Sequence, residues 1–272
     1  MKEEYIIVDD LSSFDIRQIL DCGQIFRYAK TGEGEYVVFS GSKRLSVKQD
    51  GEKAVICGDR EFARRFFDLE RDYGAIKERL SGLPLMKESI AYGSGIRILN
   101  NDPFEMIISF IISANNHIPR IKGIIERLCN DLGEDMGGYH AFPAAQALAQ
   151  KDENYYFAQG AGYRAPYLAS TARAIAEGKF DIDSVREMPT PQAQKYLTSL
   201  AGVGPKVADC ILLFGYHRTD VFPVDTWIKK VYRDLIGEGA TSAQMRKRLI
   251  DTYKDLAGYA QQYLFFAKRD NG

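Results

Sequence analysis

The sequence has few of the features that mark membrane, secreted or repetitive proteins. No apolar run in its 272 residues approaches the roughly 18 residues of a membrane-spanning helix, and the N-terminal residues Met-Lys-Glu-Glu-Tyr show no signal-peptide pattern. No internal repeat or low-complexity tract is present. These absences predict a globular protein located in the cytoplasm.

Cysteine is scarce, and charge of one sign does not dominate. The four cysteines show none of the short spacings that bind zinc or an iron–sulfur cluster, so free thiols are expected. The formal net charge is −1, which argues against a protein that coats nucleic acid non-specifically. Nucleic-acid binding would need local basic patches, and three candidates exist: Arg120 with Lys122 and Arg127, Arg164 with Arg173, and Lys229 with Lys230 and Arg233. Each patch taken alone is more often a solvated surface.

Residues 1–83 read as a small antiparallel sheet domain. Short runs rich in β-branched and aromatic residues alternate with turns that contain Gly, Asp and Lys. A short helix over 13–20, capped by Ser12 or Ser13, and a helix from Asp59 through Phe67 accompany them. The predicted strands are 5–8, 25–28, 36–39, 45–47 and 54–57.

From about residue 84 to residue 272 the pattern changes to helices. Asp102-Pro103 begins a helix with Phe104, Ile107, Ile108, Ile111 and Ile112 on its buried side, and Pro119 lies near the start of a helix that ends at Leu132. Further helices are expected at about 143–150, 165–177, 190–200 and 257–268. The fold class predicted is therefore α+β, with an N-terminal antiparallel sheet domain followed by a mostly helical domain.

The most informative stretch is a helix-hairpin-helix at about 191–215. A helical pattern ends at Leu200 and runs into Gly202-Val203-Gly204, whose glycines permit positive φ, and Pro205 suits the first position of a new helix. The backbone amides of this turn and the new helix N-terminus converge on one point. Such a turn is suited to binding a phosphate of a DNA strand.

Two reactive side chains each lie at a helix N-terminus in this region. Lys206 opens the second hairpin helix, where the positive end of the helix dipole favours a neutral amine, the form a nucleophile needs. Asp225 follows Pro223-Val224 and is well placed to cap a third helix. Taken alone, Lys206 would be a solvated lysine and Asp225 a simple cap; the hairpin between them favours a catalytic interpretation.

The hairpin, Lys206 and the Pro-Val-Asp loop together resemble the helix-hairpin-helix DNA glycosylases. Further residues narrow the resemblance to the 8-oxoguanine DNA glycosylases, and the similarity runs through nearly the whole chain. The stretches that carry it are Gly23-Gln24-Ile25-Phe26-Arg27, Asn115-Asn116-His117-Ile118-Pro119-Arg120, Gly162-Tyr163-Arg164, Lys206 with Cys210, Asp225, and Gln261 with Phe265.

This resemblance implies a role for each matching residue. Lys206 would be the nucleophile and Asp225 its electrostatic partner, while Gly202, Val203 and Gly204 would hold the DNA backbone. For the flipped base, Gly23 would read N7–H, Cys210 and Phe265 would sandwich the ring, and Gln261 would contact the Watson–Crick edge. Asn115, Arg120, Tyr163 and Arg164 would handle the gap in the duplex and the orphaned cytosine.

The expected activity is excision of 8-oxoguanine, preferably opposite cytosine, through a lysine Schiff base, followed by strand cleavage by β-elimination. The resemblance implies no cofactor, no catalytic metal, double-stranded DNA as partner, a monomer, and a nucleoid-associated location in a prokaryote, because no targeting extension precedes the sheet. Ala114, His117, Pro119 and Trp227 depart from the family pattern. The alternatives are a related glycosylase for alkylated bases or oxidised pyrimidines, and a non-catalytic DNA-binding module.

Overall fold

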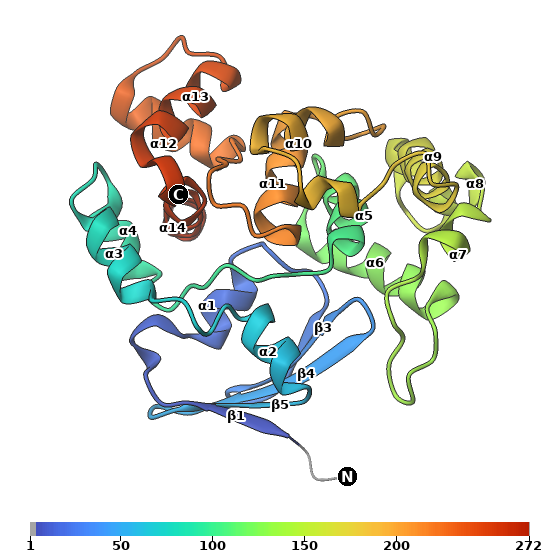
Figure 1. Ribbon diagram of the computed structural model, residues 1–272, viewed down its shortest axis with the longest axis horizontal. Coiled ribbons are helices and arrows are strands. Elements are labelled where there is room, and N and C mark those ends of the chain that lie inside the picture. Colours follow the sequence, from blue (N-terminus) through green and yellow to red (C-terminus); the bar gives the residue numbers. More distant parts are fainter. Residues whose placement is uncertain (1–3, 272) are drawn as a thin grey trace.

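The computed structural model describes residues 4–271 and combines one antiparallel sheet with a larger helical part (Figure 1). The sheet lies at the bottom of Figure 1, and most of the helices lie above it. Its strand order is β1-β5-β4-β3-β2, with every neighbouring pair antiparallel. The strands are β1 (Tyr5–Val8), β2 (Tyr28–Gly32), β3 (Glu35–Ser40), β4 (Lys43–Gln49) and β5 (Ala54–Cys57).

The sheet forms where the sequence alternates buried and more exposed residues. Tyr36 pairs with Val47 and Val38 with Leu45, so these four side chains share the buried face. The predicted strand at 25–28 is wrong in position, because pairing begins only at Tyr28 and Ile25 and Phe26 are buried in a non-strand segment. The turn at 21–24 directly precedes this segment.

The helices that border the sheet differ in one cap from the expectation. Helix α1 (Ile16–Asp21) is capped by Asp15, whose carboxylate accepts from the Gln18 amide at 2.9 Å, and not by Ser12 or Ser13. Those serines lie in a single 3-10 turn instead. Asp59 caps α2 (Arg60–Phe66) as predicted. The next helices are α3 (Tyr73–Ser81) and α4 (Met86–Tyr92), which the sequence analysis did not place.

Helix α5 (Pro103–Ser113) comes next. Asp102 caps it, and every residue from Glu105 to Ile112 is buried. Its hydrophobic pattern predicted one buried face, whereas Met106, Ser109 and Phe110 are buried as well. The other helices are α6 (Ile118–Leu132), α7 (Ala145–Ala149), α8 (Glu153–Ala158), α9 (Ala165–Ala176), α10 (Thr190–Leu197), α11 (Pro205–Gly215), α12 (Thr226–Ile236), α13 (Ser242–Tyr253) and α14 (Ala257–Asn271).

Two apolar cores underlie this arrangement. The smaller one joins the sheet to α1 and α2, and the larger one fills the helical part. Tyr73, Ile76 and Leu80 of α3 belong to the larger core. The α+β fold class is confirmed, while the domain boundary at residue 84 stays a prediction.

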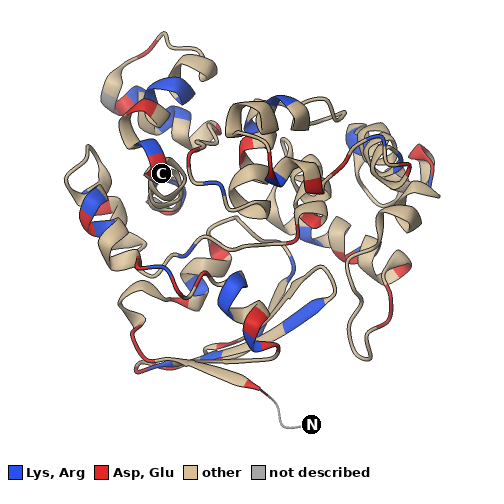
Figure 2. Cartoon of the chain, viewed as in Figure 1, with Lys and Arg blue, Asp and Glu red and all other residues tan. Residues whose placement is uncertain are grey.

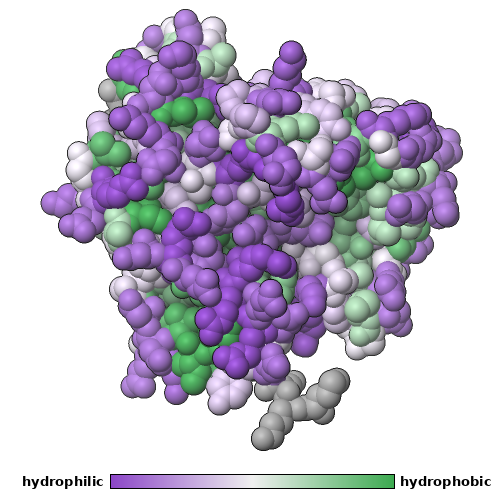
Figure 3. Space-filling model, in the orientation of Figure 1, coloured by the Kyte–Doolittle hydropathy of each residue, from purple (hydrophilic) through white to green (hydrophobic). Residues whose placement is uncertain are grey.

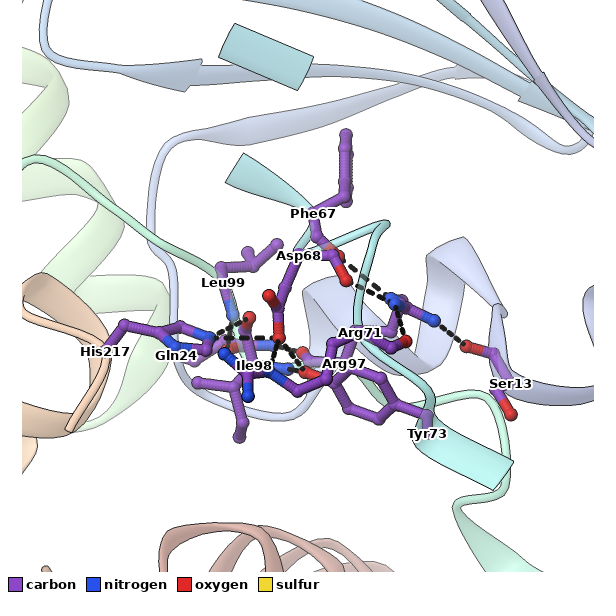
Figure 4. A network of polar contacts seen from close by, with 10 residues as sticks. All are labelled: Ser13, Gln24, Phe67, Asp68, Arg71, Tyr73, Arg97, Ile98, Leu99 and His217. Carbon is purple, nitrogen blue, oxygen red and sulfur yellow. Dashed lines mark hydrogen bonds and ion pairs between the residues drawn. The ribbon is translucent and has the colours of Figure 1, made fainter. Parts of the chain in front are cut away.

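A polar network fastens the two parts together near the end of α11 (Figure 4). The Asp68 carboxylate accepts from Arg71 Nε at 2.7 Å and from the Tyr73 hydroxyl at 3.1 Å, and lies 3.4 Å from His217 Nε2. Arg97 donates to the backbone carbonyls of Ser13 and Phe67. His217 lies two residues after the end of α11, so this network links the sheet side of the molecule to the hairpin helix.

Basic and acidic residues are interspersed along the chain (Figure 2), and hydrophilic residues cover much of the face in Figure 3. This distribution agrees with the net charge of −1. Among the helices within residues 4–271, none has the length and apolar character that crossing a bilayer would require.

Candidate active site

In the hairpin between α10 and α11, one of the two glycines adopts the positive φ that the sequence predicts, and the other does not. Gly202 has φ of +81°, and a Cβ there would come within 2.9 Å of the Tyr167 side chain, so glycine is required twice over. Gly204 is extended, with φ of −86°, and serves as the N-cap of α11 with Pro205 at its first turn. Val203 is buried, which fixes the turn against the helical core.

Lys206 lies in the first turn of α11 and is half-buried. Its Nζ is 5.7 Å from the centre of the Phe110 ring on α5. Cys210, one turn further along, is buried, and burial raises the pKa of its thiol to about 11 although the nearby Lys206 amine lowers it. The thiol therefore stays neutral at physiological pH, which leaves the Lys206 amine as the candidate nucleophile beside it.

Asp225 is the N-cap of α12 and also faces Lys206. Its Oδ1 accepts from the Ile228 amide at 2.8 Å. Burial raises the pKa of this carboxyl, and the Ile228 N–H and the charge of Lys206 oppose that rise. The residue is thus a cap, as the simple interpretation predicts, and it lines the same cavity as Lys206.

A small cavity of about 60 Å³ brings together residues from segments far apart in the sequence. It is lined by Gly23, Lys206, Cys210, Asp225, Gln261 and Phe265, all singled out by the sequence analysis, and by Cys22, Phe110, Phe214, Pro223 and Gln262. Gln261 is buried, and within the described residues its Oε1 has no hydrogen-bond partner. An orphaned buried acceptor is costly, so it predicts a ligand that donates to it.

The cavity is too small for a base in this structure. Typical ligand pockets measure roughly 300–1,000 Å³, far more than the volume found here. The ring of Phe265 lies close to Gly23, because its Cε1 would be 3.3 Å from a Cβ at that residue. A planar base could enter only after the side chains that line the cavity move apart.

The remaining predicted residues form a second cluster around the loop after α5. Asn115 is exposed and has φ of +49°. Tyr163, 56% exposed, donates its hydroxyl to the Ala114 carbonyl at 3.1 Å. Arg164 is buried, donates to the carbonyls of Ala114 and Asn115, and lies 4.3 Å from the Tyr163 ring centre. Arg120 is exposed and donates to the Gly160 carbonyl at 2.9 Å.

Sequence reasoning did not single out several residues of the site. Phe110 lies on a helix whose apolar residues all looked like core, and Pro223 appeared only as part of a loop. Gln262 follows Gln261 directly, and this Gln-Gln pair within the apolar first part of α14 was the available signal.

Larger hollows lie elsewhere. One of about 640 Å³ is bordered by β2, β3 and α6, and one of about 740 Å³ by α4, α12 and α14; neither contains Lys206 or Asp225. Over the described part of the chain, no group of three or more His, Cys, Asp or Glu side chains could hold a metal ion. The cysteines are free, as predicted.

Comparison with known proteins agrees with this geometry. Residues 6–107 match the model of the 8-oxoguanine DNA glycosylase N-terminal domain, and residues 108–254 match that of the HhH-GPD superfamily base excision DNA repair protein. The fold and site thus define the class of helix-hairpin-helix base excision repair proteins.

Individual relatives place the chain within that class. It is 34% identical to a probable N-glycosylase/DNA lyase of Methanothermobacter thermautotrophicus (76% of this chain, 72% of the relative) and 30% identical to N-glycosylase/DNA lyase OGG1 of Arabidopsis thaliana (90% and 75%). A Clostridium acetobutylicum 8-oxoguanine glycosylase/lyase, solved with double-stranded DNA containing cytosine opposite 8-oxoguanine, superposes with a TM-score of 0.94 at 38% identity, covering 99% of this chain and 97% of that one. The chain belongs to the 8-oxoguanine DNA glycosylase family.

Proposed function

We propose that this protein is a bifunctional DNA glycosylase and abasic-site lyase that excises 8-oxoguanine and then cleaves the strand. The observation that carries the proposal is one cavity lined by Lys206, Asp225 and Gln261, whose Oε1 has no hydrogen-bond partner among the described residues. The cavity lies at the N-terminus of α11, beside a hairpin suited to a DNA phosphate. The partner is double-stranded DNA.

The chemistry begins with the base already turned out of the duplex. Asp225 stabilises positive charge at C1′ as the bond to N9 lengthens, and the departing base takes up a proton. The Lys206 Nζ forms the new bond to C1′ and loses a proton, and opening of the sugar ring yields a Schiff base. Loss of a proton from C2′ then expels the 3′ phosphate, which completes β-elimination.

Selection of the lesion depends on hydrogen-bond polarity within the cavity. 8-Oxoguanine carries a proton on N7, whereas guanine has a lone pair there, so a fixed acceptor distinguishes the two. The Gly23 carbonyl is our candidate for that acceptor. The Gln261 Oε1 would accept from the Watson–Crick edge, and Cys210 and Phe265 would cover the two faces of the ring.

The loop cluster provides the response to the opposite strand. Cytosine offers O2 and N3 as acceptors, which suits two arginine donors, Arg120 and Arg164. In the present state Arg120 donates to one backbone carbonyl and keeps further N–H groups for cytosine, whereas Arg164 donates from all three of its nitrogens and would have to exchange partners. Asn115 would line the gap and the exposed Tyr163 ring would wedge into the stack.

Two alternatives are weaker. A glycosylase for alkylated bases lacks the lysine at this position, and the branch for oxidised pyrimidines carries a cysteine cluster that this sequence does not show. A module that only holds DNA would have no use for Lys206, Asp225 and the base pocket together.

We further propose that the protein acts as a monomer, without a cofactor, in the cytoplasm of a prokaryote. The relatives named above include a plant protein, so the origin stays a prediction.

The direct test is cleavage of a labelled duplex that contains one 8-oxoguanine opposite cytosine. Strand cleavage without alkaline treatment is expected, because the lyase step follows excision. Cleavage only after alkali would reveal base removal without a lyase. An intact strand under both conditions would refute the proposed substrate.

A further inference from the structure

The turn at residues 21–24, between α1 and β2, has most of its carbonyl groups fixed from outside. Arg269 Nη1 donates to the Asp21 carbonyl at 2.6 Å, and Gln262 Nε2 donates to the Cys22 carbonyl at 2.7 Å. Asn101 Nδ2 reaches the Gln24 carbonyl at 3.3 Å. Among residues 4–271, no hydrogen-bond donor is found for the Gly23 carbonyl, the remaining one of the four.

Two of these donors come from the same helix, α14, which also supplies Gln261 and Phe265. Gln262 is buried, with 1% of its surface exposed. Arg269 is held in turn, because its Nε donates to Asp270 at 2.8 Å and its guanidinium carbon lies 5.5 Å from the Phe265 ring centre and 5.4 Å from that of Phe266. The helix therefore grips the turn at two successive carbonyls just before Gly23.

A glycine needs such support if its carbonyl is to act as a sensor. Gly23 has φ of +80°, and a glycine without fixed neighbours samples many backbone conformations. Hydrogen bonds weaken steeply when the donor and acceptor lose alignment. A rotating Gly23 peptide would lose its bond to an N7–H donor, and it would also cease to repel a base that has a lone pair at that position.

We propose that Gln262 and Arg269 are positioning residues for lesion discrimination: by fixing the Asp21 and Cys22 carbonyls, they orient the free Gly23 carbonyl toward the base. This inference rests on the proposed function. It assigns neither residue a contact with the reacting atoms, and it separates base reading, which needs the fixed turn, from the amine chemistry of Lys206, which does not.

The experiment compares single-turnover rates on three duplexes: one with 8-oxoguanine, one with its 7-deaza analogue that keeps O8 but lacks the N7 donor, and one with a preformed abasic site. The variants are Gln262→Met, which keeps the side-chain length, and Arg269→Met, which keeps only the apolar stem of the arginine; both remove the donors. Arg269→Lys retains a hydrogen-bond donor, so it should keep part of the wild-type excision rate and of the preference for 8-oxoguanine. Lys268→Met is the matched control, because Lys268 is the preceding residue of α14 and bonds Asp234, away from the turn.

We expect each donor-deleting variant to excise 8-oxoguanine about tenfold more slowly, the scale of one lost hydrogen bond, and the preference for 8-oxoguanine over the analogue to shrink by a similar factor. Nicking of the abasic site should stay at the wild-type rate for Arg269→Met, which does not line the cavity, as it should for Lys268→Met on all three duplexes. Because Arg269 is near the surface, its variants test the idea even if Gln262→Met folds poorly.

Two results would overturn the inference: an unchanged preference for 8-oxoguanine over the analogue, or an equal loss on the abasic duplex, which would indicate general damage to the fold. A wild-type protein that nicks abasic DNA but leaves 8-oxoguanine untouched would refute the proposed substrate as well. A wild type that excises 8-oxoguanine while the variants keep their preference would refute this inference alone.

Discussion

The ring of Phe265 lies against Gly23, so that a Cβ at residue 23 would be 3.3 Å from Phe265 Cε1. Gly23 also has φ of +80°, a conformation that other residues adopt only with strain. One glycine thus satisfies a backbone requirement and a close approach in the wall of the base pocket.

Gly23→Ala should therefore slow excision of 8-oxoguanine strongly while sparing the lyase step. The added methyl group crowds Phe265 and disfavours the positive φ, each of which disturbs the pocket wall but not Lys206. Rates on 8-oxoguanine and abasic duplexes measure the two steps separately. Gly51→Ala, in an open turn with no neighbour within 4 Å, is the matched control. If Gly23→Ala and Gly51→Ala excised 8-oxoguanine at equal rates, that result would contradict a role for the close approach of Phe265 to residue 23.

Lys206→Gln should bind damaged DNA but lose both base removal and strand cleavage, because an amide cannot form an imine. Borohydride should trap the wild type on DNA covalently and leave the variant untrapped. Lys247→Gln removes an exposed lysine of α13 that pairs with Asp251, and it should trap normally. A variant that nicks at the wild-type rate would remove Lys206 from the mechanism.

Asp225→Asn should preserve binding and slow the chemistry by about 10²-fold, the scale for removing one preorganised charged group. Asparagine can still cap α12 through its side-chain oxygen, so the change separates the cap from the charge. Thermal unfolding provides the check. If the melting temperature falls enough to account for the lost activity, the carboxylate serves only as a cap.

Arg120→Ala should lose activity mainly on lesions opposite cytosine, since a mismatched donor at one base position costs about 1–3 kcal/mol. Arg164→Ala should show the same loss and an additional one on all four opposite bases, because Arg164 also holds the loop at Ala114 and Asn115. Single-turnover cleavage opposite each of the four bases distinguishes these patterns. Uniform weakening by Arg120→Ala would indicate a phosphate contact instead.

The Asp68 network predicts a pH-dependent contribution to stability. Burial would raise the pKa of the Asp68 carboxyl, but the bonds from His217 and Arg71 outweigh it, and the pKa is lowered overall. A carboxyl with a lowered folded-state pKa stabilises the fold above its unfolded pKa, and this contribution disappears as the pH falls through the folded-state pKa.

Asp68→Asn should therefore destabilise the protein most near neutral pH, and the difference in the free energy of unfolding should shrink as the pH falls below about 4, the unfolded pKa of aspartate. Asn tolerates the positive φ of +50° at this position, so the backbone should not change. Urea titrations at several pH values measure the difference. A gap that widens on acidification would reverse the assigned sign.

Much of this architecture can be predicted from the sequence, because its signals are local. Glycines at the hairpin, Asp102 before Pro103 and the alternation around Tyr36 and Val47 each encode their element within a few residues. The cap of α1 was predicted at Ser12 or Ser13, whereas Asp15 is the cap, because Asp and Ser both favour that position and only the packing of the chain decides.

The residues of the site also divide into those that a local sequence pattern predicts and those that it does not. Residue types at fixed spacing predicted Lys206, Cys210 and Gln261, which lie on regular helices. The burial of Arg164 and the close approach of Phe265 to Gly23 depend on contacts between segments distant in the sequence, and no local pattern encodes them. Gln262 and Arg269 escaped notice for that reason, since their partners are backbone carbonyls, which carry no sequence signal.

The grip of α14 on the turn at 21–24 has a consequence for synthesis of the chain. Gln262 lies 240 positions after Cys22, and Arg269 lies 248 after Asp21. Contacts over such separations form late, and a growing polypeptide folds its earlier parts first. The hydrogen bonds that fix the turn therefore form only after α14 has been synthesised, later than the helices that carry Lys206 and Asp225.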